Sequence, residues 1–148
     1  MEFKFKKVHT VKDRIISSVV VIAGIGLYFV NAGLGAVVGV CGILMLLFYK
    51  AAYKKVDGGD AVLVKKALDA ASSCRNSLID YLGGKDVEPV VLKPDANGGV
   101  VRIEVYYNAS ESVAYAQLFN FSSYAYEPAT EVVELRGPRA DKLIGKIA

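Results

Sequence analysis

The sequence is poor in the side chains that most often carry catalysis. Its 148 residues include one histidine, two cysteines and no tryptophan. The histidine, His9, lies in a basic N-terminal tail, so residues 57–148 have none to act as a general base, a pH switch or a metal ligand. With one cysteine in that segment, a Cys/His zinc site is excluded in a single chain. No GxGxxG, phosphate-loop or GxSxG motif occurs, and we therefore predict neither enzymatic activity nor a metal or cofactor.

Charge is absent from one long stretch, the 35 residues 15–49. As a single helix this stretch would be about 52 Å long, against a bilayer hydrocarbon core of about 30 Å. Asn31, Gly33 and Gly35 supply a turn near its middle. The sequence predicts a transmembrane hairpin, with helices at about 12–30 and about 34–53 and a turn at 31–34. A cleaved signal peptide is the competing interpretation, which the second apolar stretch disfavours.

The charges divide the chain into two domains. Residues 1–56 hold eight Lys/Arg and two acids, a net charge of +6, whereas residues 57–148 hold ten Lys/Arg and thirteen acids, a net charge of −3. All the basic residues that flank the uncharged stretch lie outside the turn, so the positive-inside rule places both termini in the cytoplasm. We therefore expect an anchor, 1–56, in a bacterial inner (plasma) membrane and a cytosolic domain, 57–148. An acidic domain also argues against nucleic acid as a partner.

Small residues recur at helical spacing inside the predicted hairpin. Gly35 and Gly39 stand four residues apart, as do Ala32 and Ala36, and this spacing lets helices approach closely. Two uses fit the pattern: packing of the two helices within one hairpin, or self-association of hairpins into a homo-oligomer.

The second domain changes from a helical period to a period of two. The pattern predicts an amphipathic helix from Asp60, as N-cap, to residue 82, where two glycines end it. It then predicts strands at 87–93, 99–108, 113–122 and 130–136, with a turn at 94–98, and a closing helix from Pro138 to about Lys146. This order, α-ββββ-α, predicts an α+β fold with an antiparallel sheet, joined to the anchor by a linker at 57–59.

Three arginines and a cysteine are candidates for a site. On the predicted helix Arg75 falls on the apolar side, where it either covers apolar surface with its stem or faces an anionic ligand or a carboxylate. Arg136 and Arg139 lie at the start of the closing helix, a place that favours a small anion, although ordinary surface charge is the alternative. Cys74 is expected to be buried and inert rather than a regulatory thiol.

Aromatic residues form the densest group in the domain. Seven of them fall within 106–126: Tyr106, Tyr107, Tyr115, Phe119, Phe121, Tyr124 and Tyr126. Core packing and cross-strand pairs account for such residues in most sheets. Neighbouring residues on a strand point to opposite faces, however, and the helices are expected to cover one face only. We therefore predict that Tyr106, Tyr115, Tyr124 and Tyr126 line a surface for a protein partner or small ligand.

These features predict a non-enzymatic membrane protein whose tethered α+β domain binds a protein partner or a small ligand. The alternative is an effector that a ligand triggers and whose hairpins then perturb the bilayer. In layout, though not in any motif, the chain resembles the two-transmembrane, β-rich effectors of bacterial antiphage defence. That resemblance implies a cyclic nucleotide as the ligand.

Overall fold

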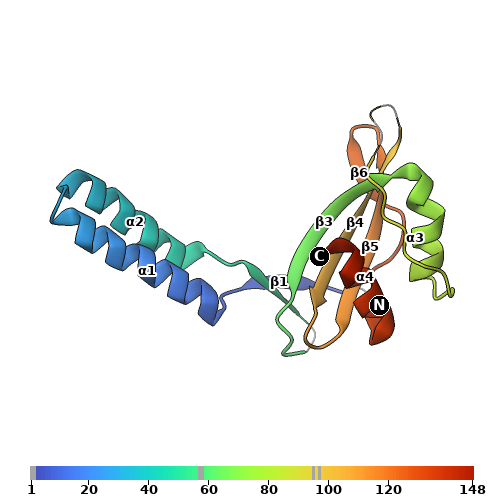
Figure 1. The fold of residues 1–148 in the computed structure, drawn as a ribbon, viewed down its shortest axis with the longest axis horizontal. Helices are drawn as coiled ribbons and strands as arrows, with labels where there is room; N and C mark the ends of the chain where they lie inside the picture. The colour runs from blue at the N-terminus through green and yellow to red at the C-terminus, as the bar shows by residue number, and fades with distance from the viewer. Residues whose placement is uncertain (1–2, 57–58, 95, 97) are drawn as a thin grey trace. The chain divides into compact units, whose positions relative to one another are not determined.

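The structure is a computed structural model that describes residues 3–56, 59–94, 96 and 98–148 (Figure 1). The chain forms two compact units. The helical unit is Lys6–Lys54, and the sheet unit combines Met1–Phe5 with Lys55–Ala148. The linker predicted at 57–59 and the turn predicted at 94–98 lie partly outside the described residues.

The helical unit is an antiparallel hairpin of α1 (Val11–Tyr28) and α2 (Ala32–Phe48). Thr10 and Asp13 begin α1 with a capping box, in which each side chain accepts a hydrogen bond from the other residue's backbone N–H at 3.2 Å. The Asn31 side chain caps α2 by accepting a hydrogen bond from the Leu34 N–H at 3.1 Å. The predicted turn at 31–34 therefore begins correctly, although its last residues already belong to α2.

Glycine allows α1 and α2 to pack closely. A Cβ atom at Gly24 would collide with the Gly39 backbone, and one at Gly35 would collide with the backbone of Tyr28. A Cβ at Gly42 would come within 2.7 Å of the Val21 N atom. The contact between the helices is therefore backbone against backbone, and Gly35 lies where a side chain would not fit.

The lengths of the two helices differ from the transmembrane spans that the sequence predicts. In the part of the chain that the structure describes, no helix is long and apolar enough to cross a membrane. Three charged residues fall in the first turns of α1, and α2 has 17 residues. The second predicted span runs to about Tyr53, but residues Ala52–Lys55 form strand β2, which pairs with β1 (Phe5–Val8).

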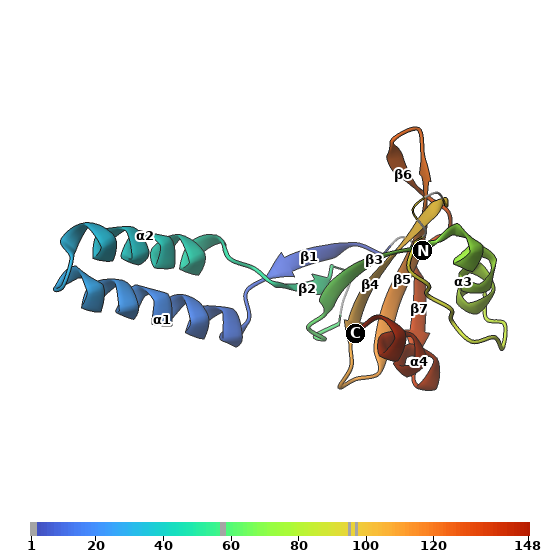
Figure 2. The same cartoon turned by 45° about the horizontal axis from the view of Figure 1, so that its top comes forward.

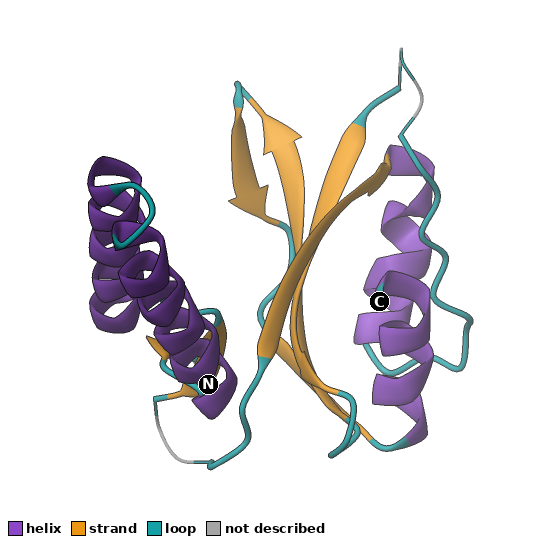
Figure 3. Cartoon of the chain, turned by 60° about the vertical axis from the view of Figure 1, so that its left-hand side comes forward, coloured by secondary structure: helices purple, strands orange, loops and turns teal. Residues whose placement is uncertain are grey.

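The described part of the sheet unit contains a sheet of five antiparallel strands: β3 (Val64–Ala71), β4 (Val100–Asn108), β5 (Val113–Ser122), β6 (Ala125–Pro128) and β7 (Val133–Arg136). They pair in the order β3-β4-β5-β6, and β7 pairs with the other half of β5. Both α3 (Arg75–Leu82) and α4 (Pro138–Ile147) cover the same face of this sheet (Figure 3). Between the helices and the sheet lies the core, which includes Leu78, Ile103, Val105, Leu118, Leu135 and Leu143.

The helix predicted at 60–82 is wrong over its first half, and Asp60 caps no helix. Residues Val64–Ala71 form β3, which pairs with β4 along its whole length, and a short turn of 3₁₀-helix, Ser72–Cys74, leads into α3. Leu68 and Ala70 face the core opposite Ile103 and Val101. The tertiary pairing overrides a composition of Lys, Ala, Leu and Asp that suits a helix.

The strand predicted at 87–93 is absent, since these residues are irregular in the structure. Pro89 is fully buried, and the Leu92 carbonyl accepts a hydrogen bond from the Ala71 N–H at 2.9 Å. Residues Ala125–Pro128, which the sequence leaves between two predicted strands, form β6, an edge strand in which a final proline loses no ladder bond. The strands at 99–108 and 113–122, the fourth strand and the closing helix are confirmed, with β7 starting at Val133 and α4 at Pro138.

Adding a methyl group at two different glycines of the hairpin should change its stability in opposite directions. Gly35→Ala should destabilise the hairpin by about 1–3 kcal/mol, because its Cβ has no room against Tyr28. Gly26→Ala should stabilise α1 by up to about 1 kcal/mol, because nothing lies within 4 Å of its Cβ and alanine favours a helix. Urea unfolding followed by circular dichroism measures both changes. Equal effects of the two substitutions would contradict this packing.

Candidate binding face of the sheet

The face of the sheet opposite α3 and α4 is here called the outer face. Side chains alternate along each strand, and those that do not enter the core point to this side. The strand register places nine of them next to one another on the three longest strands: Lys65, Ala67 and Asp69 of β3, Arg102, Glu104 and Tyr106 of β4, and Tyr115, Gln117 and Phe119 of β5.

The N-terminal segment covers one end of the outer face. The Phe5 ring stacks on Tyr106 with centroids 4.1 Å apart and also meets the edge of Tyr115 at 5.4 Å. Phe3 lies 5.2 Å from Tyr115, and the Lys55 ammonium lies over both of these rings, at 4.6 and 5.7 Å. As a result, Tyr115 is only 7% exposed. Burial and the nearby Glu134 carboxylate raise the pKa of Tyr115.

Phe3 and Phe5 are the residues of this face that the sequence analysis missed. Residues 3–6 alternate Phe-Lys-Phe-Lys, a period of two that is typical of a half-buried strand. The sequence interpretation treated them as part of a basic tail. Tyr106 and Tyr115 lie opposite each other on neighbouring strands, but Phe3 and Phe5 of the chain itself pack against them, and a binding surface there stays a prediction.

The other end of the outer face carries an ion pair. Arg102 donates two hydrogen bonds to the Asp69 carboxylate, from Nε at 2.8 Å and from Nη2 at 3.3 Å. Tyr126 donates a third to Asp69 at 3.3 Å, and the Arg102 guanidinium lies over the Tyr126 ring at 3.9 Å. The bond from Arg102 holds the pKa of Asp69 below its usual value, and the same bond raises the pKa of Arg102.

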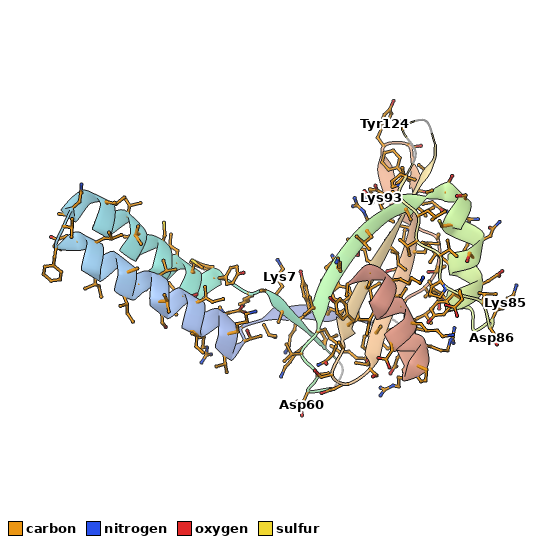
Figure 4. All side chains as sticks on the ribbon, in the orientation of Figure 1. Lys7, Asp60, Lys85, Asp86, Lys93 and Tyr124 are labelled. Carbon is orange, nitrogen blue, oxygen red and sulfur yellow. The ribbon has the colours of Figure 1, made fainter. Side chains whose placement is uncertain are left out.

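Tyr124 lies at the tip of the hairpin that joins β5 to β6 (Figures 2 and 4). Ser122 pairs with Ala125, so Ser123 and Tyr124 form a two-residue turn with φ of 51° and 63°. A turn with two positive φ angles usually takes Asn-Gly. Tyr124 is nevertheless 97% exposed, and Phe121 on the same hairpin is 49% exposed. Among the described aromatic residues of the sheet unit, these two are the exposed ones.

The three candidate arginines do not converge on one site. Arg75 donates from Nε to the Asn120 amide oxygen at 3.0 Å, so its partner is neutral rather than a carboxylate. Arg139 donates to the Tyr81 carbonyl and accepts, through its own carbonyl, a hydrogen bond from the Tyr81 hydroxyl, which ties α3 to α4. Arg136 pairs with Glu134 on the surface. A ligand for any of these arginines stays a prediction.

Two further predictions concern cysteine and the small hairpin residues. Cys74 is buried, as expected, and its sulfur accepts a hydrogen bond from the Leu92 N–H at 3.3 Å. Gly35, Ala36 and Gly39 line a shallow apolar groove of about 330 Å³ on the hairpin. Gly35 is buried between the helices, and Ala32 is exposed. Self-association through Ala36 and Gly39 stays a prediction.

The arrangement defines the class of the chain as an α+β protein with a separate helical hairpin. Within the described ranges, no group of three His, Cys, Asp or Glu side chains could hold a metal ion. Comparisons with protein-family models, with curated proteins and with solved structures find no match. Function must therefore be argued from the surfaces of the two units.

The Asp69–Arg102 pair gives a pH prediction. Because the folded state lowers the pKa of Asp69, this carboxylate contributes stability above its unfolded pKa of about 3.9, and the contribution is lost as the pH falls through the folded pKa. The pair is exposed, so we expect less than about 1 kcal/mol. Arg102→Gln should raise the pKa of Asp69 in a carboxyl NMR titration, whereas Arg136→Gln, which does not touch Asp69, should leave it unchanged. A pKa of Asp69 that does not respond to Arg102→Gln would refute the assignment.

Proposed function

We propose that the chain is a membrane-anchored binding protein without enzymatic activity, in which the helical hairpin enters a bilayer and the sheet unit binds a partner protein. The observation that carries the proposal is the surface of the hairpin. Its buried helical residues are Asp13, Ser17 and three glycines, so the large apolar side chains point outward. They include Ile15, Val19, Ile22, Ile25, Phe29, Val37, Val40, Leu44, Leu47 and Phe48.

An apolar surface of this extent favours a lipid environment. Soluble monomers rarely expose a contiguous apolar patch larger than a few hundred Å². Helices of 18 and 17 residues are about 27 and 26 Å long, somewhat shorter than the hydrocarbon core of about 30 Å. The proposal requires the hairpin to enter the bilayer from the side of its basic end, and it does not require the turn to emerge on the other side.

The charge distribution supports an orientation. The basic residues of the helical unit flank the hairpin at the end where α1 begins and α2 ends, and the turn has none. By the positive-inside rule, we propose that this end, and with it the sheet unit, lies at the cytoplasmic face of an inner membrane.

A protein partner is the ligand class that the sheet unit supports best. Placing a tyrosine rather than glycine in the left-handed region costs about 1–2 kcal/mol, and the exposed Tyr124 ring recovers none of it by packing within the chain. Tyrosine is enriched in protein interfaces because it offers a large apolar area with a polar end. We propose that Tyr124 and Phe121 contact the partner.

The native cysteines provide a test of insertion. Cys41 is exposed on α2, and Cys74→Ser leaves it as the chain's only thiol. With phospholipid vesicles, Cys41 should become protected from a membrane-impermeant maleimide, because the lipid covers it. Asp86→Cys, made in a chain without Cys41 and Cys74, places the thiol on an exposed loop of the sheet unit and should react with or without vesicles. A Cys41 that reacts equally in both conditions, in a chain that does not float with the vesicles, would rule out the anchor.

One observation favours the second candidate, a ligand-triggered effector. The segment that stacks on Tyr106 and Tyr115 is the start of β1, and β1 leads within three residues into α1. A ligand that displaced Phe3 and Phe5 from the outer face would therefore release the strand that precedes the hairpin. Such coupling requires the ligand to favour the displaced state.

The effector candidate predicts that opening the outer face activates the hairpin. The double variant Phe3→Ser/Phe5→Ser should release dye from vesicles faster than the unsubstituted chain, because the aromatic contacts that hold the segment are gone. Phe121→Ser removes an aromatic residue from the same unit, away from this segment, and should not change the rate. If the double variant binds vesicles normally and releases no dye, the effector candidate fails and the anchor remains.

A further inference from the structure

Six cations of the helical unit gather at one end of the hairpin. Because α1 and α2 are antiparallel, the residues before and within the first turn of α1 meet those that follow α2. The pairing of β1 with β2 brings in the residues beyond them. We call these six residues the basic collar: Lys6, Lys7, Lys12, Arg14, Lys50 and Lys54.

The helical unit does not neutralise the basic collar. Its only acid is Asp13, which leaves a net charge of +5 on Lys6–Lys54. Asp13 is 4% exposed, and its Oδ2 accepts hydrogen bonds from the Thr10 N–H at 3.2 Å and the Ala51 N–H at 3.3 Å. Its carboxylate therefore satisfies backbone groups rather than a cation. In the described part of the chain, none of the recorded ion pairs includes a collar residue.

The side chains of the basic collar make little contact with the rest of the described chain. Five of its six side chains are exposed and Lys54 is half-buried. Between the described residues, a cation–π contact holds one collar side chain, with the Lys7 ammonium 5.9 Å from the centre of the Tyr53 ring. Placing like charges close together is electrostatically unfavourable. The six cations lie at one end of the hairpin and none lies at the turn, which indicates an anionic partner outside the chain.

We propose that the basic collar binds the headgroups of anionic phospholipids, an inference that rests on the proposed insertion of the hairpin. The collar borders the apolar surface that begins at Ile15 and ends at Tyr49, which is 43% exposed, so lipid tails at the hairpin would place headgroups at the collar. Lysines offer point charges to a negatively charged surface, and Arg14 can bind a phosphate through two donors. Each cation near an anionic surface strengthens binding several-fold.

Vesicle flotation of the full chain tests the proposal. Vesicles of phosphatidylcholine alone are compared with vesicles of phosphatidylcholine mixed with phosphatidylglycerol. We expect the chain to partition on the order of a hundredfold more strongly into the mixed vesicles. The variant K6Q/K7Q/K12Q/K50Q should lose most of that preference while binding neutral vesicles as before. A matched variant, K66Q/K85Q/K93Q/K146Q, removes four cations from the sheet unit and should keep the preference. Circular dichroism checks that both variants are folded.

The outcomes separate the two proposals. Equal partitioning of the unsubstituted chain into both vesicle types overturns the lipid preference and leaves the anchor standing. Absence from both types overturns both. An equal loss in the two variants shows that net charge rather than the collar decides binding, which also overturns the inference. Soluble glycerol phosphate at matched ionic strength should not displace the chain beyond the effect of sodium chloride, and displacement would identify a free-phosphate site instead of a lipid surface.

Discussion

The pairing of β1 with β2 is the constraint on which both units depend. It joins two segments that are far apart in the sequence, one before α1 and one after α2. The Val56 N–H extends the pairing with a hydrogen bond of 2.8 Å to the Lys4 carbonyl, and the Asp13 carboxylate secures the other end by binding Ala51. Two consequences follow from this closure. The cations of the helical unit are gathered at one end, and Phe3 and Phe5 are held on the outer face.

The two units bury opposite kinds of residue. In the sheet unit, large apolar side chains such as Leu78, Ile103 and Leu118 are fully buried between sheet and helices, as in an ordinary soluble core. In the hairpin, glycines occupy the contact between helices and the large side chains face outward. Water provides no gain from such an arrangement, because the hydrophobic effect acts on area removed from it. A lipid environment or another apolar partner would cover the outward-facing apolar side chains of the hairpin.

Local patterns predicted the parts of the fold that depend on local rules. The strict alternation of Val101, Ile103 and Val105 predicted the strand β4, and Pro138 predicted the first turn of the helix α4. The turn at Asn31 was also visible, because an N-cap and nearby glycines carry their own signal.

The wrong predictions concern residues whose structure depends on contacts with residues far away in the sequence. Residues Val64–Ala71 satisfy a helical stripe, yet the unpaired edge of β4 makes them a strand, and a single sequence does not contain that pairing. The outer face was predicted only in part, for the same reason. Alternation showed that Tyr106 and Tyr115 point away from the core, but their cover by Phe3 and Phe5 spans about a hundred residues of sequence. The Asn120 partner of Arg75 lies 45 residues away in the chain.

The cover over Tyr106 and Tyr115 changes which residues are the best candidates for contact with a partner. A ring that is already stacked must be uncovered before it can bind, and the partner must supply that free energy. Tyr124 requires no uncovering, because it is exposed at the tip of a turn whose left-handed backbone would suit glycine better. The Asp69–Arg102–Tyr126 group braces the base of that hairpin against β3 and β4. An exposed aromatic tip on a braced hairpin loses little conformational freedom on binding, and this preorganisation favours the tip over the covered face as the first point of contact.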